Sequence, residues 1–117
     1  MENETQLNET SPELAAALRS TLALTFGVDE IACWPLNTGG GCMVMCCDLS
    51  QDGRGLGRQV WLTREDDWYL GFYDFAADEE DEGLVVALIA PEGLRESPFW
   101  VASRVAGILS RLGVTLQ

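Results

Sequence analysis

Carboxylates are the reactive side chains that this sequence offers in quantity, and two groups of them stand near one another in the chain. The first group is Glu65, Asp66 and Asp67, and the second is Asp74, Asp78, Glu79, Glu80, Asp81 and Glu82. Three interpretations are open: a solvated loop that keeps the protein soluble, a surface that mimics nucleic-acid phosphates or docks on a basic partner, and a calcium site. The second group lacks the spaced Asp-x-Asp-x-Asp-Gly pattern of a dedicated calcium loop.

Several residue types on which most enzymes depend are absent. The chain has no histidine, and its seven basic residues are all arginines. Without histidine, neither a Ser-His nor a Cys-His nucleophile pair can form. Without lysine, neither Schiff-base chemistry nor the phosphate-binding lysine of a P-loop is available. We therefore predict a protein that is not an enzyme and has no cofactor. A metal-assisted hydrolase built on Asp48, Asp52 or the acidic loop is the catalytic alternative, although no pair of carboxylates stands out.

The four cysteines are Cys33, Cys42, Cys46 and Cys47. Cys46 and Cys47 are adjacent, so in a strand their side chains lie on opposite faces and cannot both reach one tetrahedral zinc without distortion. In an oxidising compartment, Cys33 could pair with Cys42 across the first hairpin. The favoured interpretation is four reduced, buried thiols that act as small hydrophobic side chains, with no metal site.

The overall charge is strongly negative, with a formal net charge of -12 and an isoelectric point near 4.1. Such a field repels nucleic acid and anionic membranes and attracts basic partners. Direct nucleic-acid binding would require phosphates to be neutralised by cations, and seven scattered arginines cannot do this against nineteen acidic residues. The expected partner is therefore a basic protein surface, and neither nucleic acid nor a membrane.

The chain length and composition bound the domain organisation. With 117 residues, 47% of them hydrophobic, the sequence suits one folded domain. We predict a disordered tail over residues 1–10 and a single α+β domain over residues 11–117. The N-terminal residues are acidic and polar, unlike a signal peptide, and the longest apolar run, residues 84–90, is far shorter than the ~20 residues that cross a bilayer. A cytoplasmic location is expected.

The spacing of apolar residues predicts the element order α-β-β-β-β-β-α. Helices are expected over residues 12–26 and 98–112, because a Ser-Pro pair begins each and a glycine follows each. Strands are expected over residues 31–36, 42–49, 59–63, 68–73 and 84–90, with a loop at residues 37–41. The short connections favour a mainly antiparallel sheet with both helices packed on one face.

The two acidic groups should lie at opposite ends of this sheet, because one strand separates them. That strand presents Trp68, Leu70 and Phe72 on one face and Tyr69, Gly71 and Tyr73 on the other. One of these two sets of side chains must pack in the core. The other set is either also packed or forms an exposed aromatic patch rimmed by carboxylates, which is the composition expected of a protein-binding surface. The candidate partner-binding residues are the carboxylates of both groups, with Trp68 and Tyr73 as apolar anchors.

Three stretches resemble small proteins of unknown function from bacteriophages: residues 37–44, 60–63 and 68–74. Small acidic phage proteins include inhibitors of host defence, such as anti-CRISPR proteins that imitate DNA. The resembled family itself implies no activity. Together with the acidic charge, the resemblance leads us to expect an acidic binding module, a phage accessory protein or inhibitor of the anti-CRISPR or DNA-mimic kind, that occupies a basic, nucleic-acid-binding surface of a host protein.

Residues 18–31 and 105–116 are similar to the terminal helices of type III secretion chaperones, which are also small and acidic. That resemblance implies the alternative function, a homodimer that binds an extended apolar segment of a partner. The chain departs from those chaperones between its fourth and fifth strands, where they carry a helix. Residues 74–83 are too few and too acidic for one.

Overall fold

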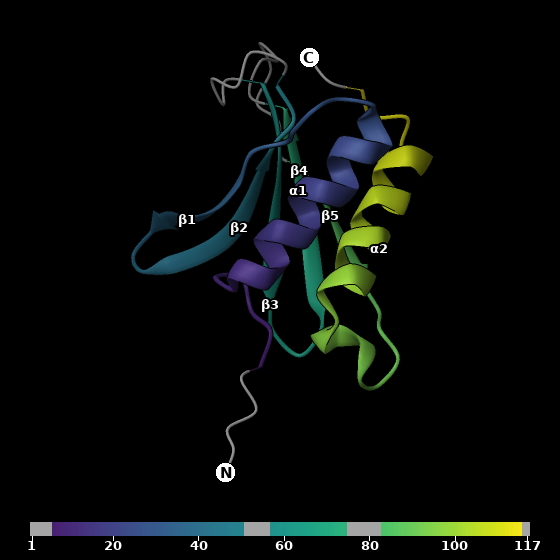
Figure 1. Cartoon of the computed structure of the whole chain (residues 1–117). Helices are drawn as coiled ribbons and strands as arrows, with labels where there is room; N and C mark the ends of the chain where they lie inside the picture. The colour runs from purple at the N-terminus through teal and green to yellow at the C-terminus, as the bar shows by residue number, and fades with distance from the viewer. Residues whose placement is uncertain (1–5, 51–56, 75–82, 116–117) are drawn as a thin grey trace.

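The computed structural model describes residues 6–50, 57–74 and 83–115 and has the α+β fold that the sequence predicts (Figure 1). Its elements in chain order are α1 (Pro12–Phe26), β1 (Cys33–Gly39), β2 (Cys42–Asp48), β3 (Arg58–Arg64), β4 (Trp68–Asp74), β5 (Leu84–Leu88), the short 3₁₀ helix η1 (Leu94–Glu96) and α2 (Pro98–Arg111). Neither α1 nor α2 has the length and apolar composition that crossing a bilayer requires.

The five strands form one antiparallel sheet in the order β1-β2-β3-β4-β5, so each strand pairs with its neighbours in sequence. The predicted antiparallel arrangement is confirmed. The first turn differs from the prediction, because β1 continues to Gly39 and the loop expected at residues 37–41 shrinks to Gly40 and Gly41. Both glycines have positive φ, 62° and 83°, which is the geometry of a tight two-residue hairpin turn.

Both helices lie on the same face of the sheet and pack against each other (Figure 1). Alternate residues of β2, β3 and β4 point toward them and close the core, with Met45, Leu62 and Leu70 fully buried. The described part of the chain places no helix on the opposite face of the sheet. Because strand side chains alternate, that face carries the other half of the strand residues.

Local sequence signals set the helix ends. The Ser97 side chain accepts a hydrogen bond from the Trp100 N–H, as expected of an N-cap residue. Ser11 holds the same position in α1, but its side-chain oxygen accepts the N–H of Asn8 instead of a helical N–H. Gly27 ends α1 in a left-handed conformation with φ 67°.

Residues 6–10 correct the prediction of a disordered tail over residues 1–10, of which residues 1–5 lie outside the described part. Leu7 belongs to the hydrophobic core, with 5% of its surface exposed. Its N–H donates to the Glu96 carboxylate over 2.8 Å, and the Glu9 carboxylate accepts the Arg64 N–H over 2.8 Å. These partners are remote in sequence, so no local pattern reveals that the segment is held.

Candidate interaction surface

The sheet face that points away from the helices carries a band of aromatic and aliphatic side chains. Trp34, Cys46, Trp61, Gly71 and Val85 occupy paired positions on the five strands, so they form one row across the sheet. We define the aromatic face as the partly or largely exposed apolar residues on this side: Trp34, Leu36, Trp61, Tyr69, Tyr73 and Val85. The face is therefore apolar on every strand of the sheet.

Two glycines make room for the central ring pair of this surface. The rings of Trp61 and Tyr73 lie 4.7 Å apart between centroids, tilted by 46°. A Cβ atom at Gly71 would stand 2.7 Å from the Tyr73 ring, closer than real side chains approach. A Cβ atom at Gly83, where φ is 77°, would likewise collide with the opposite edge of the Tyr73 ring. The missing side chains let Tyr73 lie flat across the sheet, where it supports Trp61.

Polar groups beneath the ring pair are satisfied internally. The side-chain oxygen of Gln59 accepts the Trp61 indole N–H over 2.8 Å and the Cys46 thiol over 3.5 Å. Burial and, to a lesser extent, the nearby Asp48 charge raise the pKa of Cys46 to about 12. Cys46 therefore stays protonated at neutral pH and lies buried beneath the ring pair as a small apolar group.

The cysteines follow the predicted interpretation only in part. Cys33, Cys46 and Cys47 are buried thiols, but Cys42 is exposed. The suggested pairing of Cys33 with Cys42 is wrong, because the strand register sets Cys33 opposite Cys47 and Cys42 opposite Gly39. The pKa of Cys47 is raised well above its ordinary value. The larger cause is the hydrogen bond with the Cys33 thiol, and the next is burial. The two thiols thus lie side by side in the core, beneath α1.

The two acidic groups are separated in space as predicted, as far as their members are described. Glu65, Asp66 and Asp67 form the β3–β4 turn, whereas Asp74 ends β4 at the opposite side of the sheet. Asp78, Glu79, Glu80, Asp81 and Glu82 lie outside the described residues. Glu65 and Asp66 are exposed, but Asp67 is half-buried and lies 3.7 Å from the Arg95 guanidinium. Asp74 pairs with Arg58 over 3.3 Å. The described members of the two groups, Glu65, Asp66, Asp67 and Asp74, therefore form no single compact acidic patch.

Trp68 is not the exposed anchor that the sequence predicts. Its side chain is fully buried among the core residues, and its indole N–H donates to the Arg95 carbonyl over 2.9 Å. The alternation of β4 places Trp68 on the helix side, together with Leu70. Tyr73 lies on the other side, within the aromatic face. The residues that the sequence reasoning missed are Trp34 and Trp61, which the alternation of β1 and β3 could have indicated.

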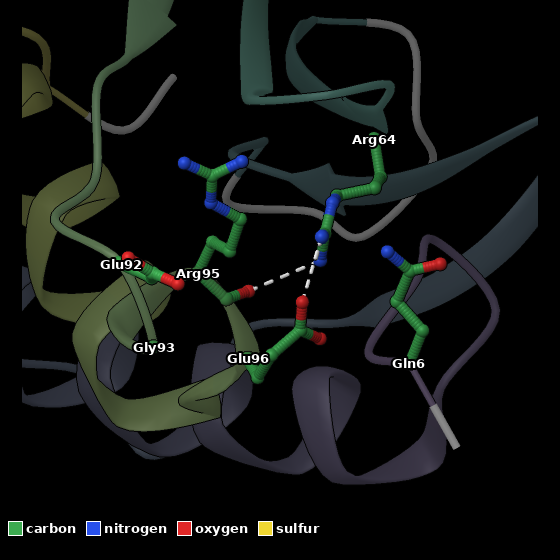
Figure 2. Close-up of a pocket in the computed structure, with 6 residues that line it drawn as sticks. All are labelled: Gln6, Arg64, Glu92, Gly93, Arg95 and Glu96. Carbon is green, nitrogen blue, oxygen red and sulfur yellow. Dashed lines mark hydrogen bonds and ion pairs between the residues drawn. The ribbon is translucent and has the colours of Figure 1, made fainter. Parts of the chain in front are cut away.

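Arg64 holds together three segments beside a cavity of about 400 Å³ (Figure 2). Its guanidinium donates to the Glu96 carboxylate over 2.7 Å and to the carbonyls of Leu7 and Arg95 over 2.9 and 3.3 Å. It also lies over the Trp68 ring, 5.6 Å from the centroid. The other cation of the cavity, Arg95, donates to the Asp66 carbonyl over 2.8 Å. Because both guanidinium groups already bind acceptors of this chain, we assign the cavity a structural role.

The described residues contain no group of three Cys, Asp or Glu side chains placed to hold a metal ion. Asp48, a candidate of the metal-assisted alternative, is 3% exposed. One of its carboxylate oxygens accepts the N–H and the hydroxyl of Ser50 over 2.9 and 2.6 Å, which is the pattern of a turn-stabilising aspartate. Asp52 lies outside the described residues.

Comparison with models of known protein families matched none of them, and searches among curated proteins and among solved structures found no significant match.

Proposed function

We propose that this protein is an acidic binding module that occupies a basic surface of a partner protein, of the kind that otherwise binds nucleic acid. The observation that carries the proposal is the aromatic face: an apolar surface across five strands, centred on the Trp61–Tyr73 pair, with no described helix over it. Aromatic side chains at the centre of a patch are the usual anchors of protein interfaces. A phage accessory protein or inhibitor is the biological setting that we propose for it.

The internal use of positive charge supports a basic partner. Arg58, Arg64 and Arg95 are each tied to a carboxylate of this chain, so they neutralise internal acids and leave the excess negative charge for the surroundings. Glu65 and Asp66 are exposed at one end of the sheet, beside the strands that carry Trp61 and Tyr69. With a net charge of -12, the chain attracts a cationic surface and accelerates the encounter with it.

The experiment begins with the immobilised protein in a lysate of the source organism, washed at low and at high salt, with mass spectrometry of the eluates. The main partner is then purified and its affinity measured by titration calorimetry with and without duplex DNA. We expect a nucleic-acid-binding protein whose binding weakens with salt and is displaced by DNA, because exposed charge contacts are screened and the two ligands compete for one surface. A partner that binds this chain and DNA simultaneously would refute the proposal.

Charge-reversal variants locate the contact. Glu65→Lys/Asp66→Lys and Glu79→Lys/Glu80→Lys/Asp81→Lys should each weaken binding to the purified partner, and the second variant tests residues outside the described part of the chain. The matched control is Asp29→Lys/Glu30→Lys, which makes the same change at an adjacent pair of exposed acids in the α1–β1 connection. Equal losses in the control and in both variants would mean that only net charge matters, and the assigned surface would be wrong.

A further inference from the structure

The two edges of the sheet are built differently. The β1 edge contains Pro35, which has no N–H, and its register with β2 shifts between Asn37 and Gly39. Both features hinder the addition of another strand. The β5 edge, of sequence Leu-Val-Val-Ala-Leu, has neither proline nor charge, and all five of its residues pair with β4 in unbroken register. Among the described residues, these protective features therefore occur on the β1 edge and not on the β5 edge.

The unprotected edge also exposes apolar side chains. Val85 is 61% exposed on the aromatic face, Leu84 is 42% exposed on the helix side, and Ile89, just after the strand, is 75% exposed. In the described part of the chain β5 pairs with β4 alone, so every second residue directs its backbone N–H and C=O away from the sheet. An added strand would satisfy these groups and cover side chains on both faces at once.

We propose that β5 binds an extended segment of the partner protein as an additional strand, and that this segment carries Lys or Arg next to alternating apolar residues. The inference rests on the proposed function and names the part of the partner that this chain recognises. Backbone pairing would supply affinity, and the exposed side chains of Leu84 and Val85 would select apolar residues at alternate positions.

Charge selects a basic partner segment over a second copy of this chain. The strand itself is uncharged, but the exposed Glu92 follows it, and the whole chain has a net charge of -12. Two copies meeting edge to edge would bring together two chains with a net charge of -12 each, which repel one another. A segment with basic ends meets an attractive field at the same edge.

The test uses a fluorescein-labelled peptide of one-letter sequence RKVTVTVKR, titrated into the full chain and followed by fluorescence anisotropy. We expect saturable binding that weakens with salt, and much weaker binding of EDVTVTVDE, which reverses the charges, and of RKVPVPVKR, which removes backbone donors. Amide hydrogen exchange of residues 84–88 should slow when RKVTVTVKR is saturating, because those amides and their neighbours become strand-paired. Equal binding of the proline peptide, or unchanged exchange in β5, would overturn the proposal.

Two variants separate this edge from other apolar positions. Leu84→Lys places a cation on the β5 edge, without changing the aromatic face, and should weaken binding of RKVTVTVKR by about tenfold or more. Leu24→Lys makes the same change at a residue of α1 that is 84% exposed, and should leave binding unchanged. Circular dichroism verifies that both variants fold. Equal affinity of Leu84→Lys and wild type for RKVTVTVKR would refute binding at the β5 edge.

The purified partner distinguishes the two proposals. If the partner binds wild type and Leu84→Lys equally but loses affinity for the Glu65→Lys/Asp66→Lys variant, the proposed function stands and the strand addition is wrong. If analytical ultracentrifugation shows a dimer of the free chain that Leu84→Lys dissociates, the occupant of the edge is a second copy, which also overturns the inference.

Discussion

The Arg64 guanidinium and the Glu96 carboxylate meet over 2.7 Å although 32 positions separate them in the sequence. Arg64 ends β3, and its side chain is 6% exposed, whereas Glu96 ends η1 and is 41% exposed. The other Glu96 oxygen accepts the Leu7 N–H over 2.8 Å. The pair therefore fixes the N-terminal segment and the approach to α2 on the end of one strand.

This pair makes stability depend on pH in the acid range. The hydrogen bond from Arg64 lowers the pKa of Glu96 below its ordinary value of 4.5, and the Leu7 N–H acts in the same direction. Because the folded pKa is below the unfolded one, the stabilisation is present above about pH 4.5 and is lost as the pH falls through the lowered pKa. Glu96→Gln should lower the melting temperature at neutral pH and flatten its decline in acid, as measured by circular dichroism. A variant with an unchanged acid decline would show that other carboxylates dominate.

Gly71 should tolerate no side chain while Tyr73 is present. In Gly71→Ala the new Cβ meets the Tyr73 ring, so we expect a loss of about 1–3 kcal/mol in the free energy of unfolding, measured by urea denaturation. In a Tyr73→Ala background the same change should cost far less, which a double-mutant cycle would show as coupling. Gly107→Ala is the control: it lies within α2 with open space at its Cβ, and should stabilise by about 0.5–1 kcal/mol. Equal costs in both backgrounds at Gly71 would contradict the contact.

Substitution of Trp68 should lower the free energy of unfolding and leave the affinity for the partner unchanged. Trp68→Phe removes the indole N–H bonded to the Arg95 carbonyl and leaves a gap in the core, for an expected loss of about 2 kcal/mol. Trp61→Phe, at a half-exposed position, should cost less stability but weaken binding to the purified partner. Chemical denaturation and calorimetric titration of both variants provide the comparison. A binding defect in Trp68→Phe at full stability would restore Trp68 as an interface residue.

The thiols should differ strongly in reactivity. Cys42 is exposed, whereas Cys46 and Cys47 are buried with raised pKa values and little thiolate to react. Treatment of the native protein with iodoacetamide at mildly alkaline pH should add one adduct, at Cys42, as seen by peptide mass spectrometry. Unfolding in urea should make all four cysteines reactive. Alkylation of Cys46 in the native state as fast as of Cys42 would contradict the burial.

The elements of this fold were predictable where the signals are local. The first helix has the predicted bounds, because Pro12 and Gly27 determine its ends through backbone geometry alone. The antiparallel order follows from short connections that leave no room for crossovers. Some strand ends differ from the prediction. The first strand is displaced from residues 31–36 to Cys33–Gly39, so the polar residues Asn37 and Thr38 belong to it and not to a loop. The fifth strand ends at Leu88, two residues before the predicted end.

The candidate site was harder to predict, because the choice between two apolar faces depends on tertiary packing. Both sets of β4 side chains are aromatic or aliphatic, so alternation alone could not decide that Trp68 faces the helices and Tyr73 faces outward. The pairing of Asp67 with Arg95, 28 residues away, likewise depends on the position of η1. Leu7 is the extreme case, since its partner Glu96 is 89 positions distant.

The contact between α1 and α2 determines when the chain can complete its fold during synthesis. Each strand pairs with a sequence neighbour, so the sheet can assemble through short loop closures soon after each strand emerges. The apolar residues of α1, such as Leu18 and Leu22, are made first, but Val105 and Leu109 of α2 follow more than 80 positions later. Until α2 is synthesised, α1 has an apolar surface that α2 does not yet cover, and the nascent chain remains open to chaperones and proteases.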